Sequence, residues 1–121
     1  MESGWGDVPG FVNGTLPANC RSRTYLNHVT SKWGVLVLLA LSQGTLRWGA
    51  LRHTVEGISE KMLASTLRTL ESDKFVERIS YPEVPPRVEY RLTPQGEELA
   101  ALLLPLLGWV ARHADEHALD A

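Results

Sequence analysis

A change in hydrophobic period near residue 73 limits the folds open to this chain more than any other feature of its sequence. Residues 59–72 carry leucines at the spacing of one helix face, whereas residues 88–92 alternate between apolar and charged side chains. The apolar face of the helix and that of the strand must both be buried in a core. We therefore expect a mainly α-helical domain with a small β-hairpin, which is an α+β fold.

The helix that begins after Ser59 has two different faces. Ser59 is a good N-cap, because its hydroxyl can accept a hydrogen bond from a free backbone N–H of the first turn. Opposite the leucine stripe lie two cations, Lys61 and Arg68, and two hydroxyls, Ser65 and Ser72. Such a face can contact the phosphates and base edges of DNA. A solvated surface helix has the same composition, so the flanking segments decide between the two.

Two helices are predicted before this one. The first covers residues 20–29, and the second covers residues 32–42, which are apolar on nearly all sides, as in the central helix of a small domain. Gly44 is placed to end the second helix as its C′ residue. The side chains expected to face inward from the first helix are Tyr25, Leu26 and Val29, and the candidate N-caps of the second are Thr30 and Ser31.

A shorter apolar pattern over residues 46–55 leads through Gly57 into the helix over residues 59–72. A short helix, a tight glycine-containing connection and a second helix with a polar outer face make a helix-turn-helix arrangement. The second helix of such a pair is the usual recognition element, which enters the major groove of DNA. We therefore expect residues 59–72 to be a recognition helix.

Residues 76–81 and 88–92 predict the two strands of a hairpin after this helix. The loop between them, residues 82–87, contains three prolines, which stiffen it and keep it from extending either strand. A hairpin with a rigid, basic tip is typical of the wing of a winged helix-turn-helix domain. Arg87 is expected at this tip, within reach of a phosphate or of the adjacent minor groove.

A last helix is predicted from Thr93, its N-cap, and Pro94, its first residue, with a kink at Pro105. It carries an apolar stripe that is larger than a compact winged domain covers by itself. Exposed patches of this kind mark interfaces, so a homodimer is the simplest interpretation. The predicted dimerisation residues are Tyr25, Leu99, Leu102, Leu103, Leu106, Leu107 and Val110, and the acidic residues Asp115, Glu116 and Asp120 follow them into solvent.

A chain of 121 residues has room for one domain. We divide it into an extended N-terminal arm over residues 1–18, a winged helix-turn-helix domain over 19–110 and an acidic helix end over 111–121. The formal net charge is -2. Lysines and arginines number eight against seven acidic residues over 45–91, but one against five over 92–121. Any DNA contact must therefore be local rather than the effect of a global basic field.

Cysteine content and hydropathy favour a cytoplasmic protein that does not contact a membrane. Cys20 is the single cysteine, so no disulfide can form within the chain. No signal-peptide pattern is present. The longest apolar run, residues 35–41, is far shorter than the roughly 20 residues that span a bilayer.

Several motifs carry a family resemblance. They are Lys32-Trp33, Gly57-Ile58-Ser59-x-x-Met62-Leu63, Leu67-x-x-Leu70-Glu71, Val76-x-Arg78, Tyr81-Pro82-Glu83-Val84-Pro85-Pro86-Arg87-Val88-Glu89-Tyr90 and Leu92-Thr93-x-x-Gly96. Together they resemble the HxlR-type bacterial transcriptional regulators of the MarR-like winged-helix group, over roughly residues 20–109. Two positions depart from the family. Arg21 follows the cysteine where proline is usual, and Lys74 stands where glycine is common.

The resemblance implies a dimeric DNA-binding repressor or activator that reads a pseudo-palindromic operator. The candidate DNA-binding residues are Ser59, Lys61, Met62, Ser65, Thr66, Arg68, Pro86 and Arg87. Some members of the family sense electrophiles or oxidants through a cysteine where Cys20 stands. A position near a helix N-terminus beside Arg21 and Arg23 favours a reactive thiol, whereas a lone cysteine also serves as a small buried hydrophobe. An electrophile or a small-molecule effector would change the spacing of the two recognition helices.

Other function classes have less support in the sequence. A winged helix can serve as a protein–protein interaction module without binding DNA, and salt dependence discriminates, because only DNA binding weakens steeply as salt rises. A thiol enzyme using Cys20 would lack a matching base, and we expect no catalysis and no cofactor. His113 and His117 lie four residues apart near Glu116 without a completing cluster, so we expect no metal site.

The tryptophans expected to pack in the core are Trp33, Trp48 and Trp109.

Overall fold

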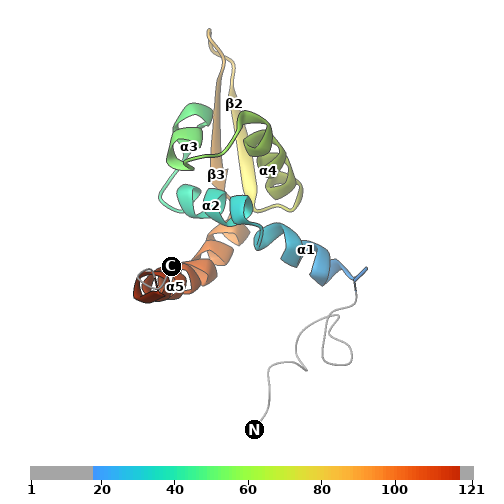
Figure 1. Cartoon of the computed structure of the whole chain (residues 1–121). Helices are drawn as coiled ribbons and strands as arrows, with labels where there is room; N and C mark the ends of the chain where they lie inside the picture. The colour runs from blue at the N-terminus through green and yellow to red at the C-terminus, as the bar shows by residue number, and fades with distance from the viewer. Residues whose placement is uncertain (1–17, 118–121) are drawn as a thin grey trace.

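The computed structural model describes residues 18–117, which form five helices and three strands (Figure 1). In chain order they are α1 (Arg21–Val29), α2 (Lys32–Leu41), β1 (Leu46–Arg47), α3 (Trp48–Thr54), α4 (Glu60–Ser72), β2 (Val76–Tyr81), β3 (Arg87–Leu92) and α5 (Pro94–His117). The predicted N-terminal arm lies outside the described residues, apart from its last position, and so does Asp120. The elements are those of the predicted α+β fold, with one strand more.

Local capping explains where three of the helices begin. Ser31, Ser59 and Thr93 each accept a hydrogen bond from the backbone N–H three residues later, at 3.0–3.1 Å. These hydroxyls satisfy amide groups that have no partner within the first helical turn. The predicted starts of α2, α4 and α5 are therefore confirmed, with Ser31 rather than Thr30 as the cap of α2.

The three strands form an antiparallel sheet in the order β1-β3-β2. The β2–β3 hairpin runs in register from the pair Val76 and Leu92 to the pair Tyr81 and Arg87. Strand β1 was not predicted, because two residues are too short to show a period, and it is a strand through its pairing with β3. In Figure 1 the hairpin rises past α3 and α4 to a tip at the top of the domain.

The core lies between the helices and one face of the sheet. Helix α2 supplies Val37 and Leu38, both fully buried, which confirms its predicted central place. The leucine stripe of α4 is buried as well, with Leu63 and Leu70 almost completely shielded from solvent. Burying a leucine stabilises the fold by about 1.5–3 kcal/mol, so these contacts hold α4 in place. Trp33 and Trp48 pack against this core, as predicted.

Helix α1 differs from the prediction. None of its residues is buried, and Tyr25 and Leu26 are each 46% exposed, so the prediction that they face inward is wrong for the single chain. Val29 is half-buried. The reason is that α1 packs on α2 and α4 and then projects away from the domain, as Figure 1 shows. The ring of Tyr25 meets that of Phe75 edge to face, with centroids 6.4 Å apart.

Helix α5 continues through Pro105 to His117 as one helix, and the predicted kink stays a prediction. Its apolar stripe is divided between two environments. Leu103 is buried in the chain's own core, so its predicted place among exposed dimer contacts is wrong, whereas Leu102 is 71% exposed. Successive residues of a helix point about 100° apart, which separates these two neighbours.

The far half of α5 extends beyond the domain (Figure 1). Trp109 is therefore 53% exposed, and the prediction that it packs in the core is wrong. Its ring instead stacks on that of His113, with centroids 3.8 Å apart. Leu106 and Val110 are also exposed in this half, so residues 18–117 leave an apolar surface uncovered there.

Three residues between elements have positive φ angles. Gly57, in the helix-turn-helix connection, has φ +90°, a value that glycine adopts at low cost. Gly44 has φ +142° and lies one position later than predicted, because α2 ends with Ser42 as its C-cap. Lys74, directly after α4, has φ +70°, although it carries a side chain. This is the position where the family resemblance led us to expect glycine.

Candidate nucleic-acid interface

The outer face of α4 is open to solvent, as the sequence predicts. Lys61, Ser65, Arg68 and Ser72 are all exposed on the side away from the core. Among residues 18–117, neither Lys61 nor Arg68 forms an ion pair with a carboxylate. Both cations are therefore available to an external anion without first losing an internal partner.

The other candidate residues of α4 lie at its edges. Ser59 is exposed, but its hydroxyl already caps the helix. Met62 is 41% exposed. Thr66 is half-buried beside α1, where it lines a small cleft with Asn27 and His28. The structure thus places Lys61 and Arg68 centrally on the outer face and Thr66 on its flank.

Arg87 does not lie at the wing tip, and that expectation was wrong. It is the first residue of β3, paired across the hairpin with Tyr81, whose ring lies 4.0 Å from the Arg87 Cζ atom. Its Nη2 lies 3.0 Å from Glu83 Oε2, and its Nε lies 3.9 Å from Glu89 Oε2. The tip itself contains Pro86, which is exposed. Because two carboxylates and an aromatic ring surround the guanidinium, Arg87 holds the wing together.

Arg78 is the arginine that the sequence analysis missed. It pairs across the hairpin with Tyr90, which is buried. Residues directly opposite in an antiparallel pair point to the same face of the sheet, so Arg78 lies on the face that the helices cover. Its side chain is exposed and has no carboxylate partner within the described part of the chain. The motif Val76-x-Arg78 was the available signal, but it did not show the side chain's direction.

The other arginine of the hairpin is also paired. Arg91 Nε donates a hydrogen bond of 3.1 Å to Glu77 Oε1, which raises the pKa of the Arg91 guanidinium above its ordinary value. Residues 76–92 hold three arginines and three glutamates, so the hairpin has no net charge. Of these three arginines, only Arg78 has no ion-pair partner within the described part of the chain. The wing therefore presents one free cation rather than a broad basic surface.

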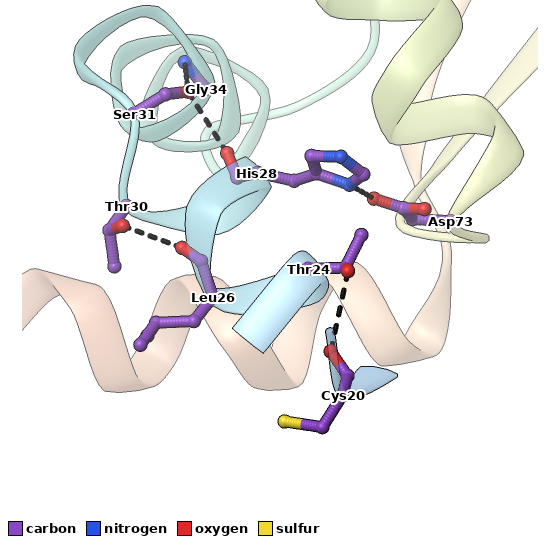
Figure 2. A network of polar contacts seen from close by, with 8 residues as sticks. All are labelled: Cys20, Thr24, Leu26, His28, Thr30, Ser31, Gly34 and Asp73. Carbon is purple, nitrogen blue, oxygen red and sulfur yellow. Dashed lines mark hydrogen bonds and ion pairs between the residues drawn. The ribbon is translucent and has the colours of Figure 1, made fainter. Parts of the chain in front are cut away.

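Cys20 is the N-cap of α1, where its Sγ accepts a hydrogen bond of 3.4 Å from the backbone N–H of Arg23. The residue is half-buried, so the single chain does not pack it into the core. At the other end of α1, His28 Nδ1 lies 2.6 Å from Asp73 Oδ2, at the C-cap of α4 (Figure 2). One helix thus connects the cysteine to the end of the recognition helix.

The described residues hold neither a metal-binding cluster nor a membrane-spanning helix. No group of three histidine, cysteine or acidic side chains there lies close enough to hold a metal ion. His113 Nδ1 lies 2.8 Å from the backbone oxygen of Trp109. No helix in this part of the chain has the length and apolar character needed to cross a bilayer.

An exposed cationic helix beside a β-hairpin, both supported on a small helical core, defines a winged helix-turn-helix protein. The chain belongs to the HxlR-like helix-turn-helix family, which matches residues 28–118. It is 52% identical over 97 residues to the HTH-type transcriptional regulator YtfH of Escherichia coli, covering 80% of this chain and 77% of that protein. The predicted family is thereby confirmed.

Solved structures agree with this assignment. The ytfH transcriptional regulator of Salmonella typhimurium is similar with a TM-score of 0.80 and 47% identity, over 86% of this chain and 93% of that one. The oxidized form of the redox regulator HypR is similar with a TM-score of 0.68 and 33% identity, over 74% of this chain and 93% of that one. YtfH and its Salmonella counterpart are named as transcriptional regulators and HypR as a redox regulator, and none of the three is named as an enzyme.

Proposed function

We propose that this protein is a homodimeric transcriptional regulator that binds duplex DNA, with α4 in the major groove. The observation that carries the proposal is the outer face of α4, where Lys61 and Arg68 are exposed and unpaired among the described residues. A cation of this kind can neutralise a phosphate and release counterions without breaking an internal ion pair. Membership of a helix-turn-helix family supports the same function.

The two ends of α4 have different proposed roles. The first turns of a recognition helix reach the base edges, so Lys61 and Ser65 are the proposed base contacts. A good bidentate base contact contributes about 1–3 kcal/mol of discrimination. Arg68 is one turn further along and is the proposed phosphate contact. Arg78 is the proposed contact of the wing with the backbone or minor groove, with Arg87 as the residue that holds the wing in shape.

The dimer is proposed from the apolar surface of α5. Leu102, Leu106, Trp109 and Val110 are exposed there, and Tyr25 of α1 is exposed as well. Large leucine-rich patches left in water are unusual for a monomer. A second copy that packs its α1 and α5 on this surface would bury it. Two recognition helices would then meet successive major grooves, about 34–36 Å apart.

The test is binding to duplex DNA from upstream of the protein's own gene and of the neighbouring gene, over a range of salt concentrations. Each phosphate contact contributes about 0.9 to the slope of log K against log salt. Because the dimer carries two copies of each arginine, we expect Arg68→Ala and Arg78→Ala each to lower the magnitude of that slope by about 2. Arg112→Ala is the matched control, because it removes the same charge from the exposed surface of α5. Arg87→Ala should change the slope less than Arg78→Ala does.

Slopes unchanged in both Arg68→Ala and Arg78→Ala would contradict the proposed interface. A folded dimer with no specific binding would instead favour the protein–protein interaction module. Sedimentation of Leu106→Glu tests the proposed dimer surface independently of DNA, through loss of the dimer. The DNA-binding proposal places the protein with the DNA, in the cytoplasm.

A response to oxidants is part of the proposal, since HypR is named as a redox regulator. Cys20 caps α1, and α1 contacts the end of α4 through His28 and Asp73. We expect a mild oxidant to lower DNA affinity and a reductant to restore it. Cys20→Ser, which keeps a capping side chain, should abolish this response and leave affinity in the reduced state unchanged. Equal responses of Cys20→Ser and the unmodified protein would exclude Cys20 as the sensor.

A further inference from the structure

A cavity of about 370 Å³ lies where α1, the turn after α4, and α5 meet. We call it the junction cavity. Its apolar wall is formed by Tyr25, Phe75, Leu99 and Leu102, and its polar lining by Asp73, Glu98 and Gln95. This volume is within the usual range for small-molecule sites, which combine apolar walls with a few placed polar groups.

The polar part of the junction cavity is negative. Asp73 and Glu98 line it, and no lysine or arginine does. The Asp73 side chain is only 10% exposed, and its Oδ2 is engaged by His28 Nδ1 at 2.6 Å. Its other oxygen, Oδ1, accepts no hydrogen bond within residues 18–117 and turns away from His28 in Figure 2. A solvent-accessible carboxylate oxygen that lacks a donor within these residues is an acceptor that a ligand can bind.

The apolar wall of the junction cavity can pack against the organic body of a cation. The rings of Tyr25 and Phe75 line the cavity and meet edge to face, at an interplanar angle of 74°. The face of an aromatic ring attracts a cation. Leu99 and Leu102 provide the surface for a hydrocarbon or aromatic body.

We propose that the junction cavity binds a small organic cation, an ammonium or amidinium group carried on an aromatic or branched hydrocarbon. Its charge lies between Asp73 and Glu98, and its body packs on Phe75 and Leu102. An anionic ligand would meet two carboxylates and no cation from the lining residues. The proposed chemistry is thus set by the charge of the lining and not by the volume alone.

An occupant of this cavity would touch the end of the recognition helix, because Asp73 is the C-cap of α4. It would also touch Tyr25 of α1 and Leu102 of α5, which belong to the proposed dimer surface, so a second copy would border this cavity in the dimer. A cation at Asp73 Oδ1 would share the carboxylate with His28 and reduce the negative charge available to His28, which would weaken the contact between α1 and α4. The effect on DNA binding rests on the proposed function, whereas the binding of the cation does not.

The test uses calorimetric titration of the full-length dimer, without DNA, with three probes of similar size: 2-phenylethylammonium, 2-phenylethanol and 3-phenylpropionate. We expect the cation alone to bind, in the millimolar range or tighter. Glu98→Gln should weaken it about two- to fivefold, as the loss of a partly exposed ion pair does. Asp73→Asn should weaken it about tenfold or more. Glu97→Gln, the next residue on α5 but outside this cavity, is the matched control and should bind normally.

Three results would overturn the proposal: no heat from the cation, equal binding of all three probes, or equal affinity in Glu98→Gln and the unmodified protein. Glu98 is exposed, so its variant tests the site even where Asp73→Asn fails to fold. A second titration measures DNA affinity with and without the cation. Cation binding without any DNA binding would refute only the proposed function, and cation binding that leaves DNA affinity unchanged would refute the coupling.

Discussion

Replacing Lys74 with glycine should stabilise this protein, because the turn after α4 requires a left-handed residue. The Lys74 N–H donates to the Glu71 carbonyl at 3.0 Å, and the Phe75 N–H donates to the Leu70 carbonyl at 2.9 Å. These two bonds, with Asp73 as the C-cap, form a Schellman motif in which Lys74 is the C′ residue. The φ of +70° follows from this motif.

The size of the effect follows from two opposing terms. A side chain in the left-handed region costs about 1–2 kcal/mol relative to glycine. Glycine in turn gives the unfolded chain more freedom, which costs about 0.4–1 kcal/mol. The net gain for Lys74→Gly is therefore about 0.5–1 kcal/mol. For a domain of this size that corresponds to a rise in Tm of about 3–6 °C.

The Lys74 conformation is also held from outside the turn, because its carbonyl accepts a hydrogen bond of 2.6 Å from Thr93 Oγ1. The chain therefore cannot relieve the cost by moving to another φ without losing that bond. We would measure urea and thermal unfolding at one fixed protein concentration, since dimerisation makes Tm depend on concentration. The matched control is Lys74→Ala, which removes the same charge and keeps a Cβ atom.

Lys74→Ala should leave the free energy of unfolding within about 0.5 kcal/mol of the unmodified protein, as exposed substitutions usually do. Equal stabilisation by alanine and glycine would show that the lysine charge, rather than the backbone, is the source of the cost. No gain from glycine would refute the strain argument altogether.

Three further stability predictions follow from the packing and capping, all measured by urea unfolding. Gly96→Ala should destabilise the protein by about 1–3 kcal/mol, because a Cβ there would overlap the backbone carbonyl of Phe75; wild-type stability would disprove that close approach. Ser59→Ala should cost about 1 kcal/mol through loss of the cap on the Met62 N–H, whereas Ser59→Asp should retain it. Leu38→Ala should cost about 2–5 kcal/mol, since the side chain is fully buried, and a loss under 1 kcal/mol would mean that the core collapses around the gap.

Local signals in the sequence determined most of the secondary structure of this protein. The caps at Ser31, Ser59 and Thr93 and the change of period near residue 73 act over only a few residues, so they can be recognised without the fold. The helix-turn-helix, the hairpin and the outward face of α4 were all predicted on this basis. The family resemblance likewise rested on contiguous motifs, and it singled out position 74, where the φ angle of Lys74 is positive.

Only the tertiary structure decided which of two like side chains is paired or buried and which is exposed to solvent. Arg78 and Arg87 stand on the same hairpin, but strand register puts Arg87 against Tyr81 and two glutamates, and leaves Arg78 without an ion pair to any described residue. Leu102 and Leu103 are neighbours in the chain, but one is exposed and the other belongs to the core. Exposure and ion pairing depend on what lies close in space, and those neighbours come from segments that are distant in the sequence.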